Sequence, residues 1–167
     1  QAAQYIAAGI TTDHECFTKD EALDKVRAGC KISIREGSAA RNFDALYTLL
    51  GEFPGQVMLC SDDKHPDELL LGHINMLVRR AVASGIDVYD ALRAACITPI
   101  EHYKLPVGRL RVGDAADFIE VDSLQDFNAR RTWINGQLVA ANGKTSIARV
   151  ELKVANKLLE AQRLEQR

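Results

Sequence analysis

Three short apolar runs, each followed by a polar cluster and then by an amphipathic stretch, constrain the fold of this chain more than any other feature. The runs cover Ile10–Thr12, Cys30–Ile34 and Val57–Cys60. Strands that alternate with helices in this way are typical of a parallel sheet. Parallel sheets place their functional loops after the C-terminal ends of the strands. The sequence therefore predicts an α/β fold with its functional residues in the polar clusters.

The stretches that follow the apolar runs have the capping signals and spacing of helices. Thr18, with Glu21 three residues later, has the pattern of a capping box and predicts a helix over Lys19–Ala28. Further helices are predicted over Ser38–Leu50, Leu71–Ser84 and Val88–Cys96. Pro99 is expected to break the last of these helices.

The pattern of apolar and polar residues changes after Pro106, where short β-type runs and turn residues replace the amphipathic stretches. Two apolar runs flank Asn135-Gly136, a dipeptide that strongly favours a hairpin turn. We therefore expect three parts: an α/β part over residues 1–105, a small β-domain over 106–145 and a helical tail over 146–167.

The number of strand–helix repeats is small for a complete parallel fold. Three repeats are visible, whereas a (β/α)8 barrel typically needs about 250 residues. An open sheet of three parallel strands would leave both edges bare, which favours unwanted pairing. The chain also begins with Gln1 rather than with Met. These features predict either a fragment of a larger barrel or a unit that pairs with something else.

Composition argues against several classes of protein. The chain has 21 Lys and Arg against 23 Asp and Glu, a formal net charge of −2, so a basic nucleic-acid-binding surface is not expected. It has neither an apolar run of the roughly 18 residues that cross a bilayer nor a basic start typical of a signal peptide. The cysteines at positions 16, 30, 60 and 96 lack CxxC spacing, which favours reduced, buried thiols in a cytoplasmic protein.

The first polar cluster is Asp13-His14-Glu15, directly after the first apolar run. A neutral imidazole at the end of a strand can bind a metal ion or act as a general base, and flanking carboxylates can orient it. A histidine that is simply hydrogen-bonded into its loop is the alternative. His14 is therefore a candidate metal ligand.

The third polar cluster contains the adjacent carboxylates Asp62 and Asp63. Two acids directly after an apolar strand are costly to place near a core unless a cation or hydrogen bonds stabilise them. One of them could bind a metal ion and take a proton from water. Alternatively, Asp63 caps the next turn. His65 and His73 follow, either as candidates for substrate contact or as structural residues.

The second polar cluster, Arg35–Ser38, joins a strand candidate to a helix candidate. Its Gly-Ser pair can present free backbone N–H groups and a capping hydroxyl, so this loop could hold a polar part of a substrate. An ordinary connecting loop with Ser38 as a helix cap fits these residues equally well.

In order and spacing, the three clusters resemble those of the bacterial-type adenine deaminases of the amidohydrolase superfamily. The resemblance rests on ITTDHEC over Ile10–Cys16, REGSAA over Arg35–Ala40 and CSDDKHP over Cys60–Pro66. The segment Gly108–Phe118 is similar to the small β-domain that accompanies the barrel in that superfamily. The resemblance implies that residues 1–105 are the last strands and helices of a metal-dependent (β/α)8 amidohydrolase barrel, with the small β-domain appended.

The resemblance also implies roles for particular residues. His14 would bind the metal ion, and Asp62 would both bind it and carry the proton. Asp63 would be a second catalytic acid. The residues implied to contact the substrate are Glu36, Ser38 and His65. The remaining metal ligands of the family have no counterpart in this sequence, so the isolated chain is expected to be inactive.

The implied activity is hydrolytic deamination of adenine to hypoxanthine and ammonia, with a divalent metal ion, Mn²⁺ or Fe²⁺, as cofactor. The intact enzyme would be a cytoplasmic homo-oligomer that acts on adenine and binds neither nucleic acid nor membrane. Two alternatives stay open. One is another amidohydrolase, such as a cyclic amidase or a different nucleobase deaminase. The other is a non-catalytic α/β interaction module whose acidic loops are solvated.

Overall fold

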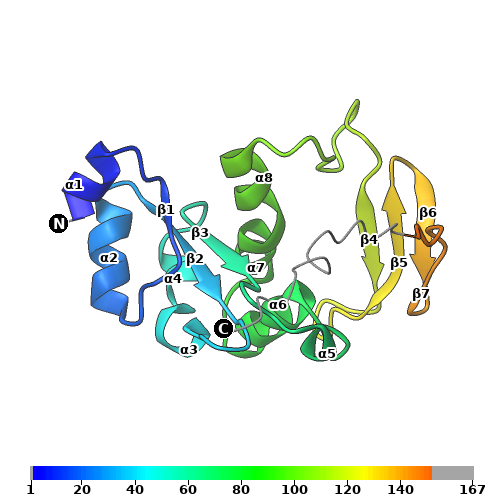
Figure 1. Cartoon of the computed structure of the whole chain (residues 1–167), viewed down its shortest axis with the longest axis horizontal. Helices are drawn as coiled ribbons and strands as arrows, with labels where there is room; N and C mark the ends of the chain where they lie inside the picture. The colour runs from blue at the N-terminus through cyan, green and yellow to red at the C-terminus, as the bar shows by residue number, and fades with distance from the viewer. Residues whose placement is uncertain (1, 152–167) are drawn as a thin grey trace, which may run out of the picture.

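The computed structural model describes residues 2–151, and the first part of the chain contains a three-stranded parallel sheet (Figure 1). Its strands, in the order β1-β2-β3, are β1 (Thr12–Asp13), β2 (Lys31–Arg35) and β3 (Val57–Cys60). The three predicted strands are confirmed, although the first starts at Thr12 rather than at Ile10. Among the described residues, the outer edges of β1 and β3 have no partner strand. The predicted α/β class is therefore confirmed, and the sheet is open.

Alternation along β2 separates an apolar face of the sheet from a polar one. Ile32 and Ile34 are fully buried and belong to the hydrophobic core, which also contains residues of β3 and of the surrounding helices. Because successive side chains on a strand point to opposite faces, Ser33 and Arg35 lie on the other face. The last residue of β2 thus presents a charge away from the main core.

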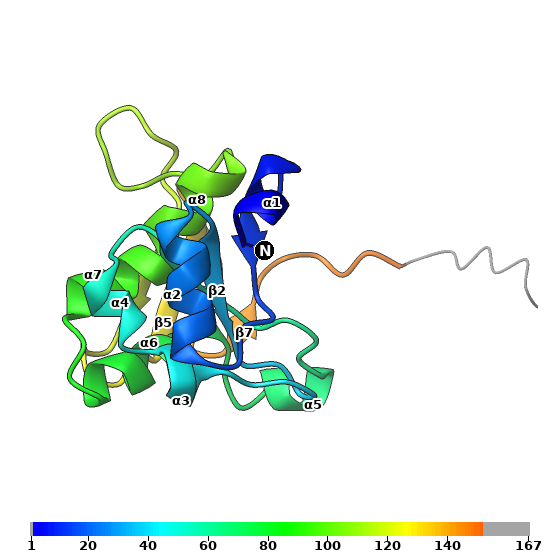
Figure 2. The same ribbon diagram turned by 90° about the vertical axis from the view of Figure 1, so that its left-hand side faces the viewer.

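Helix α2 (Lys19–Arg27) lies alongside β2 and begins where the sequence predicts (Figure 2). The hydroxyl of Thr18 accepts a hydrogen bond from the N–H of Glu21 (3.3 Å), which is one half of the capping box. The other half is shifted by one residue, because the Glu21 carboxylate accepts from the N–H of Phe17 (3.2 Å). Both bonds satisfy N–H groups at the start of the helix.

The helix predicted over Ser38–Leu50 is wrong in its first half. The structure has two short helices, α3 (Phe43–Leu46) and α4 (Leu49–Glu52). Residues 36–42 form a loop instead, in which Glu36 and Arg41 pair as an isolated antiparallel bridge. This pairing satisfies backbone groups without a helical turn, so the Gly-Ser pair does not start a helix.

The remaining helices lie at the N-terminal end of the chain and after β3. They are α1 (Ala2–Ala7) at the N-terminal end and, after β3, α5 (Pro66–Leu69), α6 (Ile74–Ala83), α7 (Val88–Leu92) and α8 (Thr98–Tyr103). The helix predicted over Leu71–Ser84 starts later than expected, at Ile74. No helix formed by residues 2–151 has the length and apolar character that crossing a bilayer requires.

The expected break at Pro99 is also wrong. A π-helix, η1 (Arg93–Ile97), connects α7 to α8, and the N–H of Thr98 bonds to the carbonyl of Arg93, five residues back. Pro99 then lies in the first turn of α8. A proline is tolerated there because the N–H that it lacks would not be needed by the helix.

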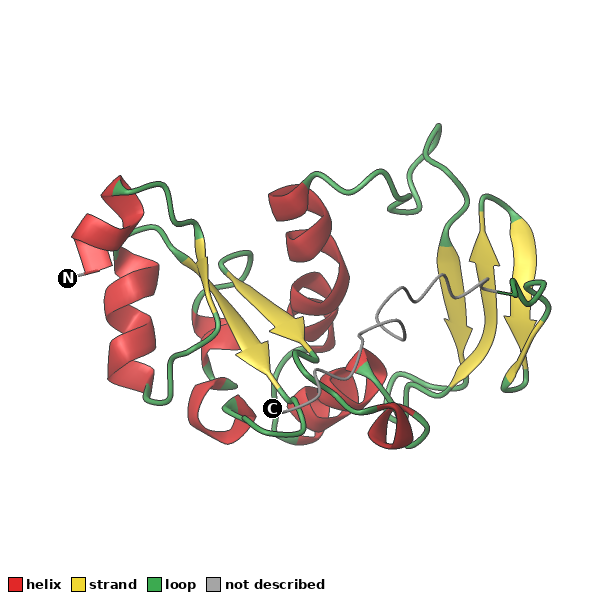
Figure 3. Ribbon diagram, in the orientation of Figure 1, coloured by secondary structure: helices red, strands yellow, loops and turns green. Residues whose placement is uncertain are grey.

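Residues 118–145 form a four-stranded antiparallel sheet (Figure 3). Its strands are β4 (Phe118–Val121), β5 (Ala129–Ile134), β6 (Gln137–Ala141) and β7 (Lys144–Thr145). The hairpin predicted at Asn135-Gly136 is confirmed, with positive φ angles of 49° and 74°. Residues 146–151 form no helix, and the rest of the predicted helical tail lies outside the described residues.

The loop between β4 and β5 connects the two sheets by packing. Phe127 in this loop is only 3% exposed and belongs to the hydrophobic core of the α/β part. Its carbonyl accepts a hydrogen bond from the side-chain amide of Asn75 in α6 (3.1 Å). Figure 1 shows this loop beside α6. The loop between β4 and β5 therefore packs against the α/β part, in addition to the covalent connection between the two parts.

Candidate metal and catalytic site

Asp13, the last residue of β1, anchors the loop that carries His14 and Glu15. Its carboxylate accepts hydrogen bonds from the N–H of Glu15 (2.8 Å), the thiol of Cys16 (3.3 Å) and the ammonium of Lys25 (2.9 Å). Burial alone would raise the pKa of Asp13, but these bonds lower it below its ordinary value. Asp13 therefore stays ionised and is committed to holding the loop.

The ends of three strands bring four charged or titratable side chains together, here named the rim cluster. His14 and Glu15 follow β1, Arg35 ends β2 and Asp62 follows β3. Nε2 of His14 lies 3.9 Å from Oδ1 of Asp62 and 3.3 Å from Oε1 of Glu15. The structure thus places side by side the two residues that the sequence analysis gave to the metal ion.

Arg35 lies at the centre of the rim cluster. Its Nη1 donates to Oδ2 of Asp62 (3.0 Å) and to Oε1 of Glu15 (3.1 Å), and its Nη2 donates to Oε2 of Glu15 (2.7 Å). Burial would lower the pKa of Arg35, but the two carboxylates raise it. The sequence patterns assign no role to Arg35. Its position at the end of a buried strand, between two acidic clusters, is the signal that could have identified it.

Asp62 and Asp63 face different surroundings because the chain turns sharply between them. Asp62 has a left-handed backbone conformation (φ 47°), which aspartate tolerates better than most residues do. Its side chain is 28% exposed and faces two other members of the rim cluster, His14 and Arg35. The side chain of Asp63 bonds instead to the loop that follows β2.

Asp63, Ser38 and His65 are brought together, but by bonds that join two loops to each other. Oδ1 of Asp63 accepts from the backbone N–H groups of Ser38 (3.0 Å) and Ala39 (3.4 Å). The Ser38 hydroxyl donates to Glu68 (2.6 Å) and accepts from the N–H of His65 (2.9 Å). These three predicted site residues therefore form a group that is separate from the rim cluster in its hydrogen bonding.

Both carboxylate oxygens of Glu36 are engaged by the protein. Oε1 accepts from the N–H of Phe43 at the start of α3 (3.2 Å), and Oε2 accepts from Nη1 of Arg80 (3.0 Å). The Arg80 guanidinium also lies over the Phe43 ring, 4.3 Å from its centroid. Glu36 thus satisfies an N–H at the first turn of α3 and forms a half-buried ion pair.

Asn42 joins the loop after β1 to the end of β2. Its Oδ1 accepts from the N–H of Arg35 (2.8 Å), and its Nδ2 donates to the carbonyls of Cys16 (2.9 Å) and His14 (3.4 Å). Sequence analysis missed this residue, and no local signal marks it, because the partners come from another segment of the chain.

His14 and Asp62 fit a divalent cation as two of its ligands. Imidazole nitrogen and carboxylate oxygen are donors that such ions accept, and two donors, each about 2.1 Å from one ion, can lie 3.9 Å apart. Across residues 2–151, no group of three or more His, Cys, Asp or Glu side chains is arranged to hold a metal ion. Since a competent site needs about three or more protein ligands, further ligands would have to come from elsewhere.

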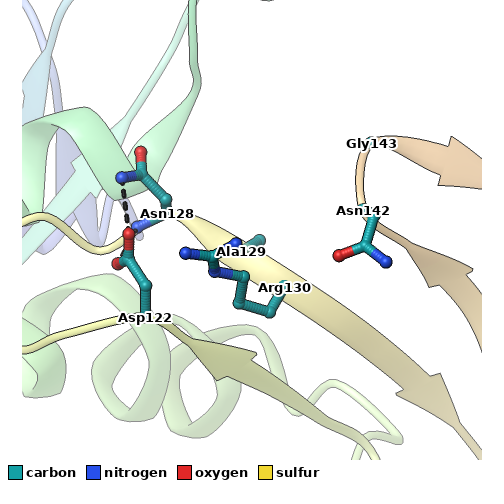
Figure 4. A pocket seen from close by; sticks show the side chains of 6 residues that line it. All are labelled: Asp122, Asn128, Ala129, Arg130, Asn142 and Gly143. Carbon is teal, nitrogen blue, oxygen red and sulfur yellow. Dashed lines mark hydrogen bonds between the residues drawn. The ribbon is translucent and has the colours of Figure 1, made fainter.

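Within residues 2–151, cavities also lie outside the rim cluster. The cavity shown in Figure 4, of about 400 Å³, is lined by Asp122, Asn128, Ala129, Arg130, Asn142 and Gly143. It lies on the antiparallel sheet and shares no residue with the rim cluster, so cavity size does not identify the site. A second cavity, of about 200 Å³, lies beside the loops after β2 and β3, and its lining includes Glu36, Arg41 and Lys64.

Several proteins named adenine deaminase are similar to this chain in sequence. The protein from Salinibacter ruber is 57% identical over 155 residues, which cover 93% of this chain and 28% of that protein. The protein from Methanosarcina acetivorans is 56% identical over 141 residues, 84% of this chain and 26% of that protein. The protein from Borreliella burgdorferi is 49% identical over 144 residues, with the same coverage. The chain thus spans little more than a quarter of the length of these curated relatives.

Solved structures show the same fold. A crystal structure of beta-aspartyl dipeptidase from Fervidobacterium islandicum AW-1 has a TM-score of 0.63 at 22% identity, and the match covers 79% of this chain and 37% of that chain. A structure of the dipeptidase with a beta-Asp-Leu dipeptide gives a TM-score of 0.61 at 20% identity, covering 79% and 38%. The sequence profile of the amidohydrolase family matches residues 4–139, which is most of the chain. The chain therefore belongs to the amidohydrolase family.

Proposed function

We propose that this chain forms the C-terminal part of the catalytic barrel, together with the adjoining β-domain, of an amidohydrolase that deaminates adenine. The parallel order β1-β2-β3 and the unpaired outer edges in the described part of the chain support a partial (β/α)8 barrel. The short span of the chain relative to proteins named adenine deaminase supports it too. In this proposal residues 1–105 belong to the barrel, 106–145 to the β-domain and 146–167 to a C-terminal tail.

The observation that carries the proposal is the 3.9 Å approach of Nε2 of His14 to Oδ1 of Asp62, across the ends of β1 and β3. His14 serves as a metal ligand through Nε2, which Glu15 also approaches (3.3 Å), and Asp62 serves as both ligand and proton carrier. A divalent cation bound there, with Mn²⁺ and Fe²⁺ as the candidates, would lower the pKa of a water molecule.

The reaction combines adenine and water and yields hypoxanthine and ammonia. The Asp62 carboxylate accepts a proton from the attacking water and then delivers it to the amino group, which leaves readily only once it is protonated. In this proposal Asp63 is a second catalytic acid, and the residues that contact the substrate are Glu36, Ser38 and His65. Because other protein groups bond to the carboxylates of Asp63 and Glu36 and to the Ser38 hydroxyl, direct substrate contact by these three side chains requires a rearrangement, whereas His65 is bonded only through its backbone N–H.

Three finer statements complete the proposal. Adenine is the small-molecule substrate, the intact enzyme is a homo-oligomer and its location is the cytoplasm. The likeness to proteins named adenine deaminase supports the first of these statements, and the other two carry over the expectations of the sequence analysis.

The test is a chimera in which this chain replaces the matching segment of the Salinibacter ruber protein. Loaded with Mn²⁺ or Fe²⁺, the chimera is expected to release ammonia from adenine. His14→Asn and Asp62→Asn are each expected to lower kcat/KM by about a hundredfold to ten-thousandfold, because each removes a ligand or the proton carrier. Asp24→Asn, at an exposed carboxylate on α2, is the control and should leave activity unchanged.

A folded, metal-containing chimera that releases no ammonia from adenine would overturn the proposal. Ammonia from cytosine or guanine, or ring opening of dihydroorotate, would assign a different amidohydrolase reaction. The exchange is repeated in the Methanosarcina acetivorans protein, so that the result does not depend on one set of junctions. The isolated 167-residue chain is expected to be inactive, because it offers two of the roughly three or more ligands that a site requires.

A further inference from the structure

We infer that Arg35 is a positioning residue of the proposed site, because its guanidinium holds one oxygen of the Asp62 carboxylate and leaves the other facing His14. The inference rests on the proposed function, since it concerns how Asp62 is aimed for metal binding and proton transfer. It makes a buried arginine, and not only the carboxylate itself, a determinant of the catalytic geometry.

The two oxygens of Asp62 have different partners. Oδ2 accepts a hydrogen bond from Nη1 of Arg35 (3.0 Å), whereas Oδ1 lies 3.9 Å from Nε2 of His14. The last torsion of an aspartate side chain is broad, so an unrestrained carboxylate rotates easily. The charge-assisted bond from Arg35 to Oδ2 fixes the plane of the Asp62 carboxylate. Oδ1 is then the oxygen left to bind an ion or a proton.

Arg35 is itself held rigidly. Nη1 and Nη2 grip the two oxygens of Glu15 at 3.1 and 2.7 Å, a forked geometry that fixes the plane of the guanidinium. The backbone N–H of Arg35 donates to the side chain of Asn42, and its carbonyl accepts from the Asn42 N–H (3.1 Å). The side chain is 7% exposed. The guanidinium can therefore act as a fixed reference for Asp62.

Lysine could not replace this arrangement. A guanidinium is planar and presents several donors at fixed angles, so one group can bind carboxylates from two different loops at once. An ammonium is a point charge on a flexible stem. With one positive and two negative charges among Arg35, Glu15 and Asp62, the rim cluster also keeps a net negative charge that favours a cation.

The first test measures the contact in the 167-residue chain itself, without altering Arg35. In ¹⁵N-labelled protein, the Nη groups of Arg35 should give separate, slowly exchanging NMR signals, because two carboxylates restrain them. Asp62→Asn should shift the Nη1 signals, and Asp114→Asn should leave them unchanged. Asp114 is the matched control because it is also bound by an arginine, Arg111, in the loop before β4. If Asp62→Asn leaves the Nη signals of Arg35 unchanged, the inference is overturned, whether or not the chimera deaminates adenine.

The second test uses the chimera described above. Arg35→Lys should lower kcat by about tenfold to a hundredfold and change the KM for adenine by less than about twofold, since the residue acts through Asp62 and not on the substrate. In an Asp62→Asn background the same substitution should change kcat by less than about twofold, because there is no carboxylate left to aim. Arg111→Lys should leave kcat unchanged.

The two tests separate the inference from the function on which it rests. An equal loss from Arg35→Lys in both backgrounds would show a merely structural role and overturn the inference while adenine deamination stands. An inactive parent chimera would overturn the proposed function, and the NMR signals would still decide whether Arg35 holds Asp62. If Arg35→Lys fails to fold, the NMR measurement alone decides the inference.

Discussion

A Cβ atom added to Gly37 would lie 2.1 Å from Oδ1 of Asp63, so a side chain at residue 37 and the Asp63 carboxylate would occupy the same space. That oxygen also accepts the N–H groups of Ser38 and Ala39. Glycine is needed here for the close approach of a carboxylate to the backbone. The loops after β2 and β3 are joined at this point.

Gly37→Ala should therefore lower the free energy of unfolding by about 1–3 kcal/mol, because the Asp63 carboxylate must leave its hydrogen-bond donors. Urea unfolding measures the loss. Gly51→Ala, in α4, is the control, because an added Cβ there would meet only Ile86, at 4.0 Å. This substitution should be neutral or should stabilise the protein by about 0.5–1 kcal/mol. Equal stability of wild type and Gly37→Ala would contradict this account. In an Asp63→Ala background the cost of Gly37→Ala should shrink.

Asn42→Asp should destabilise the protein by about 1–3 kcal/mol. The substitution replaces a donating amide with a carboxylate oxygen that faces the carbonyls of Cys16 and His14. Asn142→Asp, at an exposed turn residue with a φ of 50°, is the control and should stay within about 0.5 kcal/mol of wild type. Chemical unfolding of both variants provides the comparison, and a similar loss in each would refute the structural role of Asn42.

Asp114 should make stability depend on pH in the acid range. Hydrogen bonds from Arg111 and from the N–H of Arg109 lower its pKa from 3.8 to about 2. Because the folded pKa lies below the unfolded one, the stabilisation is present above about pH 4 and is lost as the pH falls towards about 2. The melting temperatures of wild type and Asp114→Asn should therefore differ near neutral pH and converge towards pH 2. Curves that stay parallel throughout would exclude this linkage, and Asp24→Asn serves as the exposed control.

Leu46→Ala should lower the free energy of unfolding by about 2–5 kcal/mol, because the side chain is fully buried in the core. Leu70→Ala is the matched control, since Leu70 is 89% exposed, and its effect should stay within about 0.5 kcal/mol. Urea unfolding of the pair tests whether the cluster around β2 is the main core. Similar losses in the two variants would contradict that assignment.

Local patterns predict the elements of this fold better than their boundaries. Apolar runs identify the three parallel strands, because burial on a sheet leaves a signal in consecutive residues. The Ser38 capping pattern misleads because the hydroxyl bonds to Glu68 and to the N–H of His65, groups from a distant segment. Pro99 misleads because the preceding π-helix changes which carbonyl is bonded.

In the candidate site too, some features follow from local sequence patterns and topology, whereas others depend on contacts with distant segments. The proximity of His14 to Asp62 follows from topology, because the ends of parallel strands share one edge of a sheet. The contacts of Arg35 and Asn42 depend on side-chain partners that spacing along the chain does not reveal. The alternative role for Asp63, satisfying N–H groups in a turn, is close to what the structure contains, but the turn belongs to the neighbouring loop.

The burial of Phe127 should make the two sheets unfold cooperatively. Loosening the antiparallel sheet would withdraw this ring from the interior and let water reach the apolar residues around β2. Differential scanning calorimetry should then record a single endotherm, and Phe127→Ala should divide it into two. A loop that looks like a connector would in that case be the reason why the molecule has one thermal transition.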